Sequence, residues 1–346
     1  MRALISAHRH LAELKGIAQT IPNEGILLSS LPLQEAQSSS AIENVVTTQD
    51  ALYKHELLPM TADPITKEVA HYASALRLGY RLVRQQDLLS LNTILKIQTC
   101  LEGNRTGFRK LPGTVLKNQQ TGETIFVPPP PDKIPEYMSD LERFINAEQD
   151  INPLICMALI HHQFETIHPF YDGNGRTGRI VNILYLVLSG LLDTPILYLS
   201  RYINQTRSDY YKRLQKVRDG ADWEAWLLYL LQGVTLTARH TTVLIKNIRN
   251  LLLEHKKHIR ERHKFYSQDL INNLFRHPYT KVAFIERDLK VSRATATRYL
   301  DALTENGVLE KHKLGRENYY VNSKLVVLLF NISEVEMEKT NAVRSQ

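Results

Sequence analysis

Cysteine is scarce in this sequence: its 346 residues include only Cys100 and Cys156, which lie in apolar, helix-like stretches and form no Cys-x-x-Cys pattern. Two isolated thiols provide neither a disulfide framework nor a thiolate metal site, so we interpret both as buried free cysteines. The cysteine content therefore predicts a protein of a reducing compartment, which we expect to be the cytoplasm.

Long hydrophobic runs are also lacking. The longest apolar stretch, 180–192, contains Asn182 and Gly190 and is too short to span a bilayer. Histidine and charged side chains interrupt the first sixteen residues, so we expect no signal peptide and no membrane partner. With 43% hydrophobic and 23% charged residues, the composition is that of an ordinary globular protein and excludes a disordered chain.

Acidic residues do not balance the basic ones, and the formal net charge is +7. The excess lies towards the C-terminus, because residues 251–316 contain fourteen Lys and Arg against eight Asp and Glu. Such an excess makes nucleic acid a possible partner of that segment.

Apolar residues recur at helical spacing through most of the chain, which predicts a mainly α fold. The exception is 113–127, where two β-prone runs flank a polar turn and predict a β-hairpin that ends before the prolines at 128–131. The C-terminal pattern predicts helices at 268–276, 282–289 and 293–306, with Ser292 as the N-cap of the third. Two strands around Gly315 and Arg316 follow, an order that resembles a winged helix.

These patterns divide the chain into five expected parts. They are an N-terminal helical region at 1–95, a central core at 96–240, a helical connector at 241–265, a winged-helix-like domain at 266–325 and a tail at 326–346.

Residues 168–179 read His-Pro-Phe-Tyr-Asp-Gly-Asn-Gly-Arg-Thr-Gly-Arg. The segment Gly173-Asn174-Gly175 precedes an apolar helical run, and converging backbone amides at a helix N-terminus suit a phosphate. Arg176 and Arg179, three residues apart, are able to hold different phosphates of one nucleotide. Asp172 is a candidate magnesium ligand and His168 a candidate general base.

This segment resembles the Fic signature, His-x-Phe-x-(Asp/Glu)-Gly-Asn-Gly-Arg-x-x-Arg, and matches every fixed position. The resemblance implies a Fic-type helical bundle that transfers AMP from ATP to a Ser, Thr or Tyr hydroxyl of a target protein and of itself. The related Doc kinases tend to have lysine where this chain has Gly175, so AMP transfer is favoured over phosphate transfer.

The resemblance also implies roles for individual residues. His168 is the expected general base, Asp172 the Mg²⁺ ligand and Phe170 a buried anchor. Helix residues around Tyr210 and Tyr211 resemble the adenine wall, with Tyr210 the expected contact. The full set expected to bind ATP is Gly173, Asn174, Gly175, Arg176, Thr177, Gly178, Arg179 and Tyr210.

Two further segments resemble regulatory and docking elements of the family. The hairpin resembles the flap that aligns a target segment by strand-type pairing, with Ile125 and Phe126 as the expected contacts. Residues 38–44 resemble the inhibitory motif (Ser/Thr)-x-x-x-Glu-(Gly/Asn), in which Ser39, Glu43 and Asn44 match. This resemblance implies that Glu43 pairs with Arg179 in the same chain and keeps the enzyme largely inactive.

Several alternatives remain open at this stage. The same site could remove AMP or use another nucleotide donor. His161, His162, Glu165 and His168 could instead hold a metal ion, because helical spacings of this kind occur in metalloenzymes. The chain could also be a DNA-binding regulator with a minor enzymatic role, and a homodimer is a further possible assembly. The expected DNA-facing residues are Arg293, Thr295, Thr297, Arg298, Lys311, Lys313 and Arg316.

Overall fold

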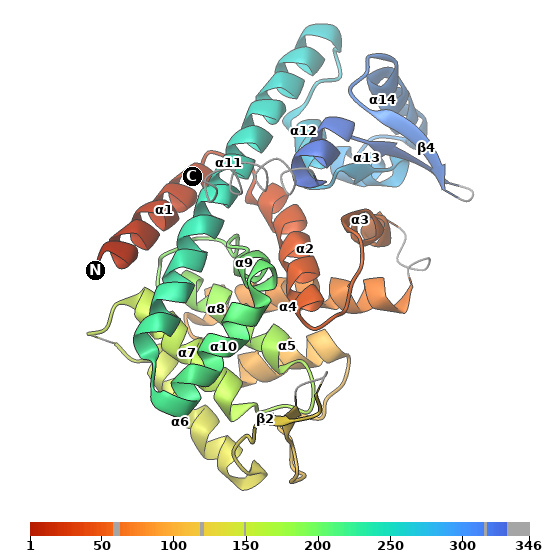
Figure 1. Ribbon diagram of the computed structural model, residues 1–346. Helices are drawn as coiled ribbons and strands as arrows, with labels where there is room; N and C mark the ends of the chain where they lie inside the picture. The colour runs from red at the N-terminus through yellow and green to blue at the C-terminus, as the bar shows by residue number, and fades with distance from the viewer. Residues whose placement is uncertain (58–62, 118–120, 149, 315–316, 331–346) are drawn as a thin grey trace.

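The computed structural model describes residues 1–57, 63–117, 121–148, 150–314 and 317–330 (Figure 1). It is mainly helical, as predicted. The N-terminal helices are α1 (Arg2–Ala18), α2 (Glu24–Ile42), α3 (Gln49–Leu57), α4 (Pro64–Gln86) and α5 (Leu91–Glu102). The central helices are α6 (Ile134–Asn146), α7 (Pro153–Ile167), α8 (Asn174–Leu188), α9 (Leu199–Gln205), α10 (Arg207–Gly220) and α11 (Trp223–Arg262).

The centre of the body is the buried helix α8, whose residues from Ile180 to Leu186 expose almost no surface. Helices α4, α5 and α7 pack against it, and α2 also reaches it. Because α8 is apolar on nearly every face, it forms only where other helices surround it. This arrangement fixes the N-terminal end of α8, and with it the signature loop, among elements from distant parts of the sequence.

The hairpin expected at 113–127 consists of β1 (Leu116–Lys117) and β2 (Thr124–Phe126), which pair antiparallel. The predicted turn residues at 118–120 lie outside the described residues. A 3-10 turn at Pro131–Lys133 leads from the hairpin into α6, as the proline run allows. The flap is therefore joined directly to the helical body.

Helix α11 runs past the expected division between residues 240 and 241 as one helix of 40 residues, about 60 Å long. Its N-terminal half contacts α7, α9 and α10, and α1 packs along it (Figure 1). Its far end reaches the C-terminal module. The connector is thus the continuation of a core helix, and the exact domain limits stay a prediction.

The C-terminal module has the expected order of three helices and a hairpin. Its elements are α12 (Gln268–Arg276), β3 (Tyr279–Thr280), α13 (Val282–Leu289), α14 (Arg293–Glu305), β4 (Glu310–Leu314) and β5 (Glu317–Val321). The Ser292 side chain accepts a hydrogen bond from the Thr295 amide, as expected of an N-cap. The strand order is β3-β5-β4.

This module docks on the helices that precede the signature. Helix α12 packs against α2, and β3 contacts α3. The Tyr279 hydroxyl lies 2.6 Å from Asp50 Oδ1, and Lys281 Nζ donates to the Leu57 carbonyl at 3.1 Å. The two parts of the chain therefore share a polar interface.

Trp226 joins α11 to α7 and is fully buried, with its indole N–H donating to the Ala158 carbonyl at 3.0 Å. We expect Trp226→Ala to lower the free energy of unfolding by about 3–5 kcal/mol, because it leaves a large cavity and removes the hydrogen bond to the Ala158 carbonyl. Trp223→Ala, at a partly exposed tryptophan of the same helix, should cost clearly less. Denaturant unfolding of both variants tests this, and equal losses would contradict it.

Candidate active site

The signature loop connects α7 to α8 through two left-handed residues, His168 (φ 49°) and Gly173 (φ 74°). Asn174 closes the loop: its Oδ1 accepts from the Phe170 amide and its Nδ2 donates to the Phe170 carbonyl, both at 2.9 Å. The Phe170 ring is fully buried beside Phe108 and Phe164. Phe170 therefore has the anchoring position expected from the sequence, and the loop has a single defined path.

Two glycines allow carboxylates to approach this loop closely. A Cβ at Gly173 would lie 2.2 Å from Glu102 Oε1, and a Cβ at Gly175 would lie 2.6 Å from Glu43 Oε1. The left-handed φ of Gly173 is a second reason for glycine there. The N-terminal end of α8 therefore has acidic groups close to its backbone in this conformation, and a helix N-terminus is a place that suits negative charge.

His168 is half-buried at the end of α7. Burial, followed by the nearby charges of Arg109 and Arg218, lowers its pKa to about 4. The imidazole is therefore neutral at neutral pH and able to accept a proton.

Arg109, which was not predicted from the sequence, donates hydrogen bonds to backbone carbonyls of the signature loop. Its Nε donates to the His168 carbonyl at 2.9 Å, and its Nη2 donates to the Pro129 carbonyl at 2.5 Å. Its amide also donates to the Pro169 carbonyl at 2.9 Å. One buried guanidinium thus links the signature loop to the segment that follows the flap.

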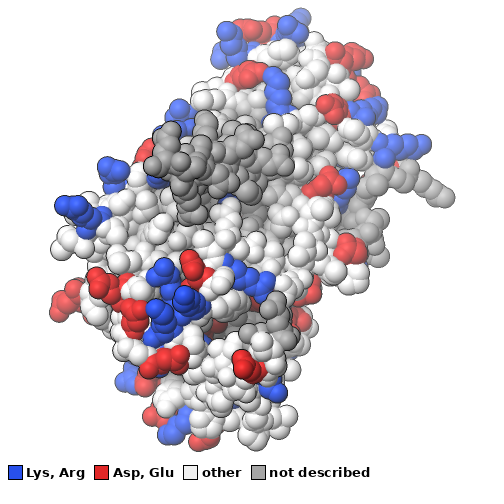
Figure 2. Space-filling view, viewed as in Figure 1, with Lys and Arg blue, Asp and Glu red and all other residues white. Residues whose placement is uncertain are grey.

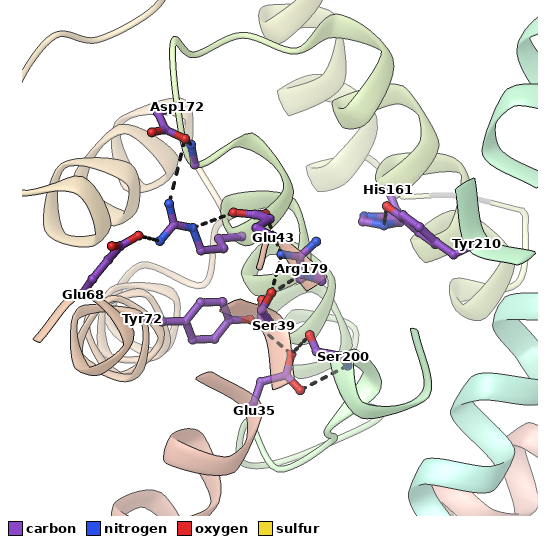
Figure 3. Close-up of polar contacts among 12 residues, drawn as sticks. Glu35, Ser39, Glu43, Glu68, Tyr72, His161, Asp172, Arg179, Ser200 and Tyr210 are labelled. Carbon is purple, nitrogen blue, oxygen red and sulfur yellow. Dashed lines mark hydrogen bonds and ion pairs between the residues drawn. The ribbon is translucent and has the colours of Figure 1, made fainter. Parts of the chain in front are cut away.

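The expected pair between Glu43 and Arg179 is present: Arg179 Nη2 donates to Glu43 Oε1 at 2.7 Å (Figure 3). Ser39, one turn earlier on α2, accepts from Arg179 Nε at 2.7 Å through its hydroxyl and from Nη2 at 3.0 Å through its carbonyl. Arg179 is only 3% exposed. All three predicted partners of this contact therefore meet.

Asn44 follows Glu43 at the end of α2 with a φ of 66°. Glycine and asparagine are the residues that most readily adopt this left-handed conformation, which gives the Gly/Asn position of the motif a physical reason. Asn44 Oδ1 also accepts from Arg207 Nη1 at 2.8 Å. The turn orients Glu43 towards α8.

Arg176 is surrounded by carboxylates, which the sequence did not predict. Its guanidinium lies 2.9 Å from Glu43 Oε2, 2.6 Å from Glu68 Oε1 and 3.1 Å from Glu102 Oε1. Asp172 is farther away, at 3.9 Å. Burial raises the pKa of Glu102 to about 6, against the effect of Arg176. Glu43 therefore bridges both signature arginines, one with each oxygen.

A fully buried carboxylate, Glu35, lies on the same helix as the residues that contact Arg179. Glu35, one turn before Ser39 on α2, accepts from the Tyr72 hydroxyl at 3.2 Å and from the Ser200 amide at 3.2 Å (Figure 3). The Ser200 hydroxyl also donates to it. Burial raises the pKa of Glu35 to about 7. Glu35, Ser39 and Glu43 thus form one polar stripe along α2.

Tyr210, the expected adenine contact, lies in the core in this conformation, and its contact with adenine stays a prediction. Tyr210 is 1% exposed, its hydroxyl lies 3.0 Å from His161 Nε2, and its ring packs near Trp226. Tyr211 is 44% exposed, and the charges of Arg179 and Glu43 act on its hydroxyl. Tyr211 is therefore the aromatic residue of this pair that has surface available to a nucleotide.

Three other residues expected to bind ATP have buried side chains or no side chain at all. Asn174 uses its amide to close the loop, and the Thr177 side chain is fully buried. Gly178 faces the core, where an added Cβ would lie 3.0 Å from Phe164. These side chains are structural in this conformation, and the role of the three residues in nucleotide binding stays a prediction that concerns their backbone.

The two expected flap contacts differ in environment. Ile125 is 46% exposed, whereas the Phe126 ring is covered by the Arg218 guanidinium at 3.9 Å from the ring centre. Arg218 in turn donates to the Glu165 carbonyl at 3.0 Å. Phe126 therefore attaches the flap to the body, and Ile125 is the side chain that remains available for docking.

The proposed metal ligands His161, His162, Glu165 and His168 do not form a metal site. His161 stacks on Trp226, and His162 packs edge-on against Trp223. No group of three or more His, Cys, Asp or Glu side chains within the described part of the chain is arranged to hold a metal ion. Asp172 is different, because its side chain is 77% exposed beside the loop and is open to a metal that arrives with a ligand.

The C-terminal module presents an exposed Arg293 and Arg298 on α14. In the wing, Lys311 pairs with Asp301 at 2.8 Å, and Arg316 lies outside the described residues. Figure 2 shows positive and negative side chains interspersed over the visible face of the molecule. DNA binding stays a prediction. None of the helices that the structure describes is both long and apolar enough to cross a membrane.

Three family models match successive parts of the chain. Residues 1–81 match the Fic/DOC family N-terminal model, 87–186 match the Fic/DOC family model, and 251–325 match the C-terminal domain of SoFic-like protein adenylyltransferases. The chain belongs to the Fic family.

Curated relatives are similar to parts of this Fic chain. A probable protein adenylyltransferase of Aquifex aeolicus is 29% identical over 185 residues, covering 52% of this chain and 55% of the relative. The protein adenylyltransferase Fic of Culex quinquefasciatus is 30% identical over 141 residues, covering 40% of this chain and 26% of the relative. The matches thus span about half of the first relative and about a quarter of the second.

Solved structures of Fic proteins share the fold. A Fic family protein from Desulfovibrio desulfuricans G20 has a TM-score of 0.56 at 20% identity and covers 93% of this chain and 96% of its own. A Fic domain containing signaling protein from Bacteroides thetaiotaomicron has a TM-score of 0.57 at 18% identity and covers 71% of this chain and 97% of its own. The Fic bundle inferred from the sequence is confirmed.

The position of Arg109 leads to a prediction about this Fic loop. Arg109→Ala leaves the partly buried His168 and Pro129 carbonyls without their side-chain donor, and each such loss costs about 1 kcal/mol. We expect a lower free energy of unfolding in denaturant titrations and faster amide hydrogen exchange in both the signature loop and the flap. Lys110→Ala, at the exposed neighbour, is the control. Faster amide hydrogen exchange in only one of these two segments would contradict the connection between them through Arg109.

Proposed function

We propose that this chain is a protein adenylyltransferase that transfers AMP from ATP to a hydroxyl side chain of a target protein. The observation that carries the proposal is the neutral, half-buried His168 beside the glycine loop and the two buried arginines of a complete signature. A base, an anion site and two cations converge within one loop. The names of the curated relatives agree with this activity.

In the proposed reaction, a ring nitrogen of His168 takes the proton of the target hydroxyl. The hydroxyl oxygen forms a bond to the α-phosphorus of ATP while the bond to pyrophosphate breaks. The first amides of α8 and the guanidinium groups of Arg176 and Arg179 stabilise the charge that develops on the phosphates. The protein therefore contributes position, a base and positive charge.

Within this arrangement, Asp172 is the residue that would hold Mg²⁺. Asp172 is exposed at the loop, one of its oxygens accepts from the Gly173 amide at 2.7 Å, and Mg²⁺ is usually held by one or two carboxylates together with substrate phosphates. When bound, the ion would neutralise phosphate charge. Asp172 would hold it beside the anion site.

We further propose that Glu43 inhibits the enzyme within one chain. It engages Arg176 and Arg179 with its two oxygens, so both guanidinium groups are committed to a carboxylate where ATP phosphates should bind. Since a carboxylate and a phosphate compete for the same donors, the resting enzyme should be largely inactive. Ser39 reinforces the inactive position of Arg179.

The finer features stay predictions. They are self-modification, a homodimer, removal of AMP by the same site and use of another nucleotide. The adenine preference depends on Tyr211 and its surroundings, because the phosphate site does not distinguish one base from another. Modification of Ser, Thr or Tyr fits the chemistry equally well.

Removal of the inhibitory carboxylate gives the main test. We expect Glu43→Ala to raise labelling of protein by α-labelled ATP about 10- to 100-fold, since charge-assisted hydrogen bonds contribute about 1.5–3 kcal/mol. His168→Ala should abolish labelling in either background. Glu24→Ala, at an exposed carboxylate of the same helix, is the matched control.

Each result separates the two proposals. Equal labelling by wild type and Glu43→Ala refutes inhibition while leaving the transfer activity in place. No labelling by Glu43→Ala with any lysate protein or with itself refutes the transfer activity. Mass spectrometry of labelled bands then identifies the modified side chain.

The two tyrosines of α10 provide a second test, measured in the Glu43→Ala background. We expect Tyr211→Ala to raise the KM for ATP by about 5- to 100-fold, because base stacking on an aromatic ring contributes about 1–3 kcal/mol. Tyr210→Phe should change this KM little, since it removes only the contact with His161. A larger effect of Tyr210→Phe than of Tyr211→Ala would contradict the proposed contact of Tyr211.

A further inference from the structure

A cavity of about 480 Å³ lies where the C-terminal module meets α3 and α4. One wall comes from the N-terminal helices and includes Glu56 and Arg77, and the other comes from the C-terminal module and includes Arg276, His277 and Arg287. None of its lining residues belongs to the candidate active site. The volume is in the range of small-molecule sites, about 300–1,000 Å³.

Positive charge is in excess around this cavity. Among the described residues that line it, three are arginines and two are carboxylates. Glu56 pairs with Arg77 at 3.3 Å, and Asp288 is shared between Arg287 at 2.7 Å and Arg276 at 3.7 Å. A guanidinium has five N–H donors, so these pairs leave donor capacity that an anion is able to use.

The three arginines act together on the histidine between them. Burial, followed by the charges of Arg276, Arg77 and Arg287 in that order, lowers the pKa of His277 to about 4. Glu56 Oε2 lies 3.0 Å from His277 Nδ1. The positive charges therefore converge on one place although they come from α4, α12 and α13.

Aromatic surface lies next to these charges. Phe284 and Tyr279 both line the cavity, and the Arg287 guanidinium lies 5.3 Å from the centre of the Phe284 ring. A ligand with a phosphate at the arginines would place the rest of its body against these rings. Guanidinium groups suit phosphate because their planar donors match its oxygens.

We propose that this cavity binds a phosphate-bearing small molecule of the size of a mononucleotide, with the phosphate held by Arg77, Arg276 and Arg287. The ligand would contact the C-terminal module and helices α3 and α4. The second turn of α4 carries Glu68, the partner of Arg176. Binding would therefore strengthen the interface already formed by Tyr279 and Lys281. The proposal does not depend on the transferase activity.

Calorimetric titration of the full chain tests the site with three probes: inorganic phosphate, AMP and adenosine. We expect phosphate or AMP to bind and adenosine not to bind. Tighter binding of AMP than of phosphate would identify a nucleotide, and equal binding would identify free phosphate as sufficient. No binding of either phosphate compound at millimolar concentration overturns the proposal.

Variants assign the binding to this cavity. Arg276→Gln and Arg287→Gln, both at partly exposed positions, should weaken binding roughly tenfold each, as expected for the loss of one charge-assisted contact. Two further variants are controls. Arg179→Gln detects binding at the signature loop instead of the cavity. Arg293→Gln removes one positive charge from α14, outside the cavity, and so detects non-specific attraction.

The outcomes separate the sites. Binding that is lost in Arg276→Gln and Arg287→Gln but kept in Arg179→Gln and Arg293→Gln supports the cavity. Binding that is lost only in Arg179→Gln belongs to the signature loop and overturns the proposal. An equal loss in Arg293→Gln shows non-specific attraction and overturns it as well. Thermal unfolding in the absence of probe confirms that each variant is folded.

Discussion

The double contact of Glu43 with Arg176 and Arg179 is the interaction on which the active site depends in this conformation. Two buried guanidinium groups would be unstable side by side without an anion between them. Glu43 supplies that anion from α2, a helix far away in the sequence. The same requirement for an anion makes this place suitable for nucleotide phosphates, so the proposed inhibition and the proposed substrate binding arise from one physical constraint.

Backbone conformation makes this contact possible. Gly175 leaves the space that Glu43 occupies, and the left-handed Asn44 ends α2 so that the carboxylate turns towards α8. A Cβ at 175 would lie 2.6 Å from Glu43 Oε1, so a larger residue there would displace this carboxylate. Residues of the short motif at 39–44 and of the signature at 168–179 therefore form one site together.

Much of this arrangement was predictable from the sequence, because both motifs are local and their spacing has a direct helical meaning. Ser39 and Glu43 lie one turn apart, and the structure brings both to Arg179. Glu35 continues the same spacing and could have been found by extending it. Tyr210 could also have been recognised as a core residue, because Tyr210, Leu214 and Val217 form the buried stripe of α10.

Other residues gave no such signal. Glu68, Glu102 and Arg109 reach the loop from separate segments, and a single sequence contains no information about distances between them. The sequence therefore predicted the pair of Arg179 with Glu43 but not the carboxylates that surround Arg176. The cavity beside the C-terminal module was unpredictable for the same reason, because its walls come from α3, α4, α12 and α13.

The two arginines differ in what remains when Glu43 leaves. Arg176 keeps Glu68 at 2.6 Å and Glu102 at 3.1 Å, whereas Arg179 keeps the neutral Ser39 as its hydrogen-bond partner. Departure of Glu43 would thus leave the charge of Arg179 far less compensated than that of Arg176. Glu165, whose pKa burial raises to about 7, lies close enough for the two charges to interact but does not form an ion pair with Arg179. Departure of the Glu43 carboxylate should therefore leave a strongly positive charge at Arg179. Under the proposed function, an incoming phosphate would form its most favourable electrostatic interaction with this guanidinium.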